Sequence, residues 1–126
     1  MAKRDKRSGG STQNELVVCD LEFPNFQKSL AQLNSKEINQ FFDVVENKIQ
    51  KMTWRQIYAT SSKSKKRGLN WEVIEGQKTA KGGVIASIRI TQKSRARVTR
   101  DGKFMRFISV HPDHDSAYEK GGGEDL

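Results

Sequence analysis

The clearest pattern in the chain is an alternation of apolar and polar side chains over residues 88–99. Ile88, Ile90, Ala96 and Val98 are the apolar members, and cationic or hydroxyl side chains stand between them. A period of two is typical of strands that bury one face. We therefore expect neighbouring strands with one face toward a core and one basic face.

A turn signal separates this pattern from a mostly apolar run over residues 104–110. The signal is Asp101-Gly102, and glycine takes the positive φ of a tight hairpin turn without strain. The sequence therefore predicts a β-hairpin around Asp101-Gly102. A shorter apolar run over 16–22 predicts a first strand, and residues 68–74 predict a second, followed by a flexible connection over 76–83.

Two helices are predicted between the first two strands, over residues 25–33 and 36–51. In the first, Pro24 suits the opening turn, and Phe26, Leu30 and Leu33 form one face. The second has a longer stripe at helical spacing, made of Ile38, Phe41, Phe42, Val45, Ile49 and Met52.

Two capping boxes mark helix starts. Asn34 with Glu37 is expected to begin the second helix, and Thr53 with Gln56 a short third one through Tyr58. We interpret the chain as α+β, with a small antiparallel sheet of about four strands and an N-terminal helical hairpin packed on one face. We expect a single domain over 15–119, between a basic flexible tail over 1–14 and a flexible acidic tail over 120–126.

Composition narrows the class of partner. The formal net charge of +8 on 126 residues favours a polyanion. The loop residues Lys63, Lys65, Lys66 and Arg67 are either a solvated loop or a phosphate-contacting arm. No apolar run approaches the roughly 20 residues that a bilayer needs, so we expect no membrane partner. Cys19 is interpreted as a small core residue in a reducing compartment, and we expect a cytoplasmic protein.

Both histidines of the chain, His111 and His114, fall within four residues after the basic strands. Histidine titrates near neutral pH and suits proton transfer, while the arginine fork matches phosphate oxygens. This pairing predicts metal-independent RNA cleavage by acid–base chemistry. The alternative is a polar surface turn shaped by Pro112 and Asp113, in which Asp115 and Tyr118 orient a histidine, transfer protons or cap a helical turn.

A metal site is the second reading of this cluster. His-x-x-His with interleaved aspartates offers ligands for zinc or manganese, but metal sites normally draw ligands from several elements. Glu72 and Asp101 are the other candidates near the sheet. We expect no metal and no cofactor.

From about Val17 to Tyr118, the order of these elements resembles the RelE/ParE-like toxins of bacterial type II toxin–antitoxin systems. The resemblance rests on the opening strand, the helical pair, residues 69–74, the strand pair 87–90 and 95–98, and the final apolar strand with its histidine turn. The chain departs from that pattern in its basic N-terminal segment, the loop over 63–67 and the sequence over 111–115. The resemblance implies a small RelE-like domain that either cuts messenger RNA on the ribosome or poisons DNA gyrase. It also implies a cognate antitoxin.

Three hypotheses follow: a toxin-type endoribonuclease acting on messenger RNA, a non-enzymatic toxin of the same fold that inhibits a protein such as gyrase, and a plain RNA- or DNA-binding module. The paired histidines favour the first. Its expected catalytic residues are His111, His114, Arg95, Arg106, Asp113 and Tyr118. Its expected RNA-binding residues are Lys63, Lys65, Lys66, Arg67, Arg89, Lys93 and Arg97.

Overall fold

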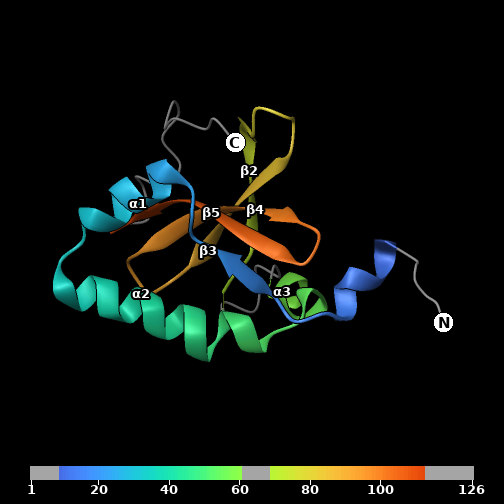
Figure 1. Ribbon diagram of the computed structural model, residues 1–126, viewed down its shortest axis with the longest axis horizontal. Coiled ribbons are helices and arrows are strands. Elements are labelled where there is room, and N and C mark those ends of the chain that lie inside the picture. The colour runs from blue at the N-terminus through green and yellow to red at the C-terminus, as the bar shows by residue number, and fades with distance from the viewer. Residues whose placement is uncertain (1–8, 61–68, 113–126) are drawn as a thin grey trace.

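The computed structural model describes residues 9–60 and 69–112 (Figure 1). Within them the chain forms one five-stranded sheet, with one 3-10 helix before its first strand and the other helices between its first and second strands. The strands are β1 (Val18–Asp20), β2 (Glu72–Lys78), β3 (Val84–Arg89), β4 (Arg95–Asp101) and β5 (Phe104–His111). The α+β class predicted from the sequence is confirmed.

The strand order is β1-β5-β4-β3-β2, and the sequential strands β2 to β5 pair antiparallel. β1 lies parallel to β5, with Val18 opposite Phe104. The expectation of an entirely antiparallel sheet of about four strands is therefore wrong at this edge. β1 and β2 follow one another among the described strands, yet they lie at opposite edges of the sheet.

The helices are α1 (Pro24–Ala31), α2 (Ser35–Asn47) and α3 (Trp54–Ala59), with a 3-10 turn η3 (Ile49–Lys51) after α2. Both predicted capping boxes are present, Asn34 with Glu37 and Thr53 with Gln56. Each box satisfies backbone N–H groups that the first helical turn leaves without partners. The predicted third helical segment is confirmed as α3.

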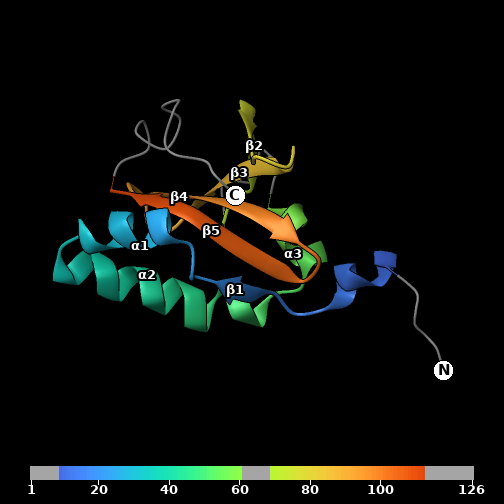
Figure 2. The ribbon, with the colours of Figure 1, turned by 45° about the horizontal axis from the view of Figure 1, so that its top comes forward.

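Figure 2 shows α1 and α2 on one face of the sheet. The rings of Phe26, Phe41 and Phe107 pack with centroids 5.4–5.6 Å apart, joining both helices to β5. Phe41, Val45 and Ile49 are buried as predicted, while Phe42 is only partly buried. This apolar layer covers one face of the sheet, and the other face carries polar side chains together with a small apolar cluster.

Several predicted boundaries are wrong: β1 is shorter than 16–22, β2 begins at Glu72 instead of residue 68, and α2 ends at Asn47 before the separate turn η3. β2 extends to Lys78, so residues 76–78, expected in a flexible connection, belong to a strand. The hairpin loop is Gly102-Lys103 instead of Asp101-Gly102, because Asp101 pairs with Phe104. Gly102 has φ +61°, which suits the first central position of a primed turn.

A bulge in β5 decides which of its side chains face the helices. Phe107 and Val110 both belong to the main core although they stand three residues apart, which strict alternation forbids. The register changes between Arg97 and Val98, so Ile108 is the additional residue. Ile108 instead packs with Ile74 and Ile85 in a small second cluster.

Residues Gly9–Asn14, which lie in the segment expected to be a tail, form the 3-10 helix η2. Arg100 of β4 holds this segment with bonds from Nη2 to Thr12 Oγ1 (2.6 Å) and from Nη1 to Gln13 Oε1 (2.9 Å). No helix in residues 9–60 or 69–112 is long and apolar enough to cross a membrane.

Candidate active site

The candidate site lies on the sheet face opposite α1 and α2, where two cross-strand rows of polar side chains meet. One row is Arg89, Arg95 and His111, on β3, β4 and β5. The next row is Ser87, Arg97 and Ser109 on the same strands. Because paired strands lie about 5 Å apart, each row brings distant parts of the chain into direct proximity.

Arg97 is the anchor of this face. It is only 1% exposed, and burial of a charge is costly unless hydrogen bonds compensate it. Its Nε donates to Ser109 Oγ at 2.8 Å, and its Nη1 donates to Gln77 Oε1 at 2.8 Å. The guanidinium thereby connects β2, β4 and β5. Arg97, expected on the RNA-binding surface, lies beneath that surface in the structure.

Ser109 links Arg97 to His111, whose Nε2 lies 2.7 Å from Ser109 Oγ. The Arg97 Nε–H can only donate, so Ser109 Oγ accepts there and keeps its own proton and a second lone pair. The hydroxyl can therefore donate to a neutral His111 Nε2 or accept from a protonated one. The contact is compatible with both protonation states of the imidazole, as proton transfer requires.

Arg95 lies directly opposite His111 and is 8% exposed. Its Nη1 donates to three carbonyl oxygens of the β3–β4 turn, those of Thr91 (3.0 Å), Gln92 (3.3 Å) and Ser94 (3.1 Å). Arg95 thus shapes the turn while it keeps a positive charge beside the histidine. Lys93 stands exposed in that same turn.

Arg106, expected to act on the scissile phosphate, lies apart from this group. It forms ion pairs with Asp20 and Asp101, each at 3.2 Å, near the opposite end of β5. Five steps along the strand separate it from His111, roughly 16 Å at about 3.3 Å per residue. The structure therefore does not bring Arg106 together with the histidine.

The remaining predicted residues lie outside the described ranges. They are the catalytic candidates His114, Asp113 and Tyr118 and the loop residues Lys63, Lys65, Lys66 and Arg67. Of the other possible metal ligands, Asp101 forms an ion pair with Arg106, and Glu72 lies on the edge strand β2, opposite Ser87 of β3. Residues 9–60 and 69–112 contain no group of three His, Cys, Asp or Glu side chains that could hold a metal ion.

Ser109 and Gln77 were not predicted as site residues from the sequence. Ser109 follows an apolar pair and looks like an ordinary strand residue, because the sequence does not show the bulge that places it beside His111. The sequence offers no direct signal, because nothing in it shows that Phe107 and Val110 share a face. Gln77 fell in the segment expected to be a loop.

Comparisons with protein-family models, with curated proteins and with solved structures give no match. The chemistry of the site must therefore be argued from its own residues.

Proposed function

We propose that the protein is a toxin-type endoribonuclease that cleaves messenger RNA on the ribosome without a metal. The observation that carries the proposal is the hydrogen-bonded series Arg97–Ser109–His111, with Arg95 opposite His111 on the neighbouring strand. An imidazole positioned on rigid strands beside a guanidinium provides both a proton acceptor and positive charge for a reacting phosphodiester.

In the proposed reaction, His111 removes the proton from a ribose 2′-hydroxyl. The 2′-oxygen attacks the adjacent phosphorus, the bond from phosphorus to the 5′-oxygen breaks, and a proton is delivered to that oxygen. The products carry a 2′,3′-cyclic phosphate and a 5′-hydroxyl. His114, Asp113 and Tyr118 are the candidates for the second proton transfer, and Arg95 stabilises the negative charge on the non-bridging phosphate oxygens.

Two buried residues, Arg97 and Ser109, act through His111. Arg97 and Ser109 position the His111 ring, and Arg106 has no part in the proposed chemistry because its ion pairs hold it at the other end of β5. Lys93, Arg89 and the basic residues over 63–67 would bind RNA. A toxin requires a cognate antitoxin, and an acidic amphipathic segment would complement the basic surface.

The test is cleavage of ribosome-bound messenger RNA, mapped by primer extension. We expect His111→Ala to abolish cleavage and Arg95→Ala to slow it about 10²-fold, as for other donors aimed at transition-state charge. Ser109→Ala should reduce the rate, and Ser109→Thr should restore it because the hydroxyl returns. EDTA should have no effect.

Arg106→Ala is the matched control, since it removes an arginine from the same sheet face and breaks only surface ion pairs. It should cleave at close to the rate of the unaltered protein. Full cleavage by His111→Ala would refute the catalytic role. Growth arrest by the unaltered protein without any RNA cleavage would instead indicate a protein target such as gyrase.

A further inference from the structure

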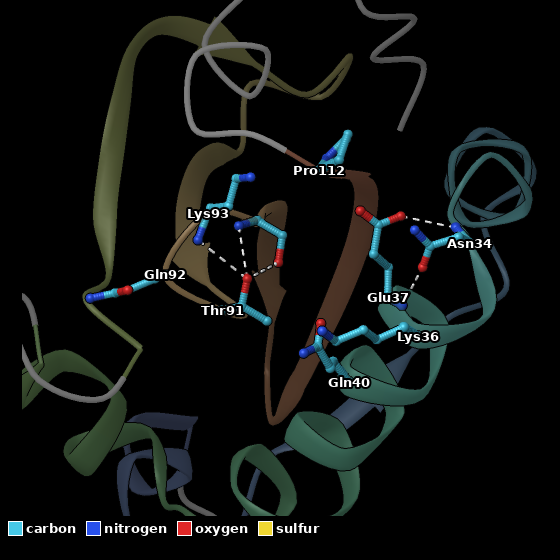
Figure 3. A pocket seen from close by; sticks show the side chains of 9 residues that line it. Asn34, Lys36, Glu37, Gln40, Thr91, Gln92, Lys93 and Pro112 are labelled. Atoms are coloured by element: carbon cyan, nitrogen blue, oxygen red, sulfur yellow. Dashed lines mark hydrogen bonds between the residues drawn. The ribbon is translucent and has the colours of Figure 1, made fainter.

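A polar cavity of 540 Å³ lies beside the candidate site, between the start of α2 and the β3–β4 turn (Figure 3). Its volume falls within the about 300–1,000 Å³ typical of ligand pockets. Pro112, the residue after His111, is part of its wall. The other lining residues are Asn34, Lys36, Glu37, Gln40, Thr91, Gln92, Lys93 and Ser94.

Glu37 presents a fixed hydrogen-bond acceptor to this cavity. One of its carboxylate oxygens, Oε1, accepts the backbone N–H of Asn34 at 2.9 Å, and Asn34 Oδ1 accepts the backbone N–H of Glu37 at 2.8 Å. Figure 3 shows the other oxygen pointing away from Asn34, toward the middle of the cavity. The capping box therefore immobilises a carboxylate whose second oxygen is available to a ligand.

Lysine ammonium groups supply donors around the same cavity. Lys93 projects from the turn across from Glu37, and Lys36 lies on the helix side (Figure 3). No ion pair engages either ammonium among residues 9–60 and 69–112. Two hydrogen bonds hold the Lys93 backbone in position. Its N–H donates to Thr91 Oγ1 at 3.3 Å, and the Ser94 N–H donates to the same oxygen at 3.0 Å.

We propose that this cavity selects guanine at one position of a single-stranded RNA substrate, an inference that rests on the proposed function. Guanine places two donors, N1–H and N2–H, beside the acceptor O6, with N7 as a second acceptor. Its donors would bind the free oxygen of Glu37, and its acceptors would bind Lys93, a common partner of guanine O6 and N7. Single-stranded bases can be splayed out and bound on these edges.

The other bases fit this arrangement less well. Adenine and cytosine place a ring-nitrogen acceptor where guanine has N1–H, so that the carboxylate meets a lone pair. Uracil offers one N–H flanked by two carbonyl oxygens, and one of these would face Glu37. Pro112 in the wall follows His111 in the chain, so the bound base would lie near the end of β5 that carries the histidine, on the helical side of the sheet.

Binding of 2′-O-methyl hexanucleotides by the full chain tests the inference without cleavage, because the methyl group blocks the attacking oxygen. The probes are hexauridylate and three versions with a single guanosine, adenosine or cytidine. We expect the guanosine version to bind about tenfold tighter or more, as for other specific base contacts.

Glu37→Gln is the decisive variant. Glutamine preserves the capping box, so its carbonyl oxygen takes the Asn34 N–H and its NH₂ group replaces the acceptor in the cavity. The variant should lose the guanosine preference while binding hexauridylate as before. Glu46→Gln removes the same charge from an exposed position later on α2 and should keep the preference.

Equal affinity for the four probes, or a preference that survives in Glu37→Gln, would overturn the inference. Cleavage of unmodified RNA is scored separately. Selective binding of guanosine without cleavage would leave the subsite standing and refute the ribonuclease. Cleavage without any guanosine preference would support the ribonuclease and refute the guanine subsite.

Discussion

At the scale of single residues, the hydroxyl of Ser109 connects the buried Arg97 to His111 and so brings these side chains into one candidate site. Arginines on a strand are common at protein surfaces and say little by themselves. Ser109 accepts from the buried guanidinium of Arg97 and contacts His111 Nε2, so it links the ring to the central strand β4. Removal of such a residue leaves Arg97 Nε without its partner, which is why a restored hydroxyl is the appropriate control.

Cys19 leads to a residue-scale prediction about pH. Burial raises the pKa of its thiol from 9.0 to about 12. Between these values the unfolded chain loses the proton and the folded protein retains it, so stability present below pH 9 is lost as the pH rises toward 12. The free energy of unfolding should fall with pH more steeply in the unaltered protein than in Cys19→Ala, by up to about 1.4 kcal/mol per pH unit. Urea unfolding measured from pH 7 to 11 checks this, and parallel curves would contradict it.

At the scale of elements, the alternation of apolar residues and the capping boxes predicted most of the strands and helices. Features that depend on contacts between distant segments were not predicted. Ala96 and Val98 face the core as their period required, and Asn34 and Thr53 begin helices because their side chains act locally. The bulge at Ile108 depends on pairing with β4, and a short-range pattern contains no such information. His111 could therefore be predicted from the sequence, while the hydroxyl that positions it could not.

The α2 capping box gives a prediction at this scale. Asn34→Ala removes the oxygen that accepts the Glu37 N–H, so the free energy of unfolding should fall by about 0.5–2 kcal/mol. Chemical denaturation measures the change. Ser35→Ala, at the next position, is the control and should change stability little, because the structure assigns its side chain no capping bond. Equal effects of the two substitutions would show that the box contributes nothing.

At the scale of the whole molecule, Arg100 joins elements that are distant in the sequence. Its guanidinium lies 4.5 Å from the Trp54 ring centroid, and it donates to Tyr58, to the Gly102 carbonyl and to both Thr12 and Gln13. One planar group thus connects α3, the β4–β5 hairpin and η2. The strong basic character of the chain concealed this role, because an arginine in a cationic sequence is readily assigned to the polyanion partner.

Arg100→Lys should loosen η2 while the sheet remains folded, since an ammonium cannot make all of these bonds at once. We expect the Glu15 amide, which donates to the Thr12 carbonyl at 3.1 Å, to exchange its hydrogen about tenfold faster or more. Hydrogen exchange followed by NMR measures this rate. Arg106→Lys, on the opposite sheet face, should leave it unchanged. Slow exchange in Arg100→Lys would show that η2 is held by other contacts.

The parallel pairing of β1 with β5 also governs the order of events during synthesis. A nascent chain that has reached only Asp101 has no strand beside Val18 and no Phe107 against which Phe26 and Phe41 could pack. Contacts of such long sequence separation form late in folding. Ser109 and His111 lie on this same last strand. The core and the candidate site therefore form in a single event. A ribosome that stops before β5 releases a chain that has neither a complete core nor the site.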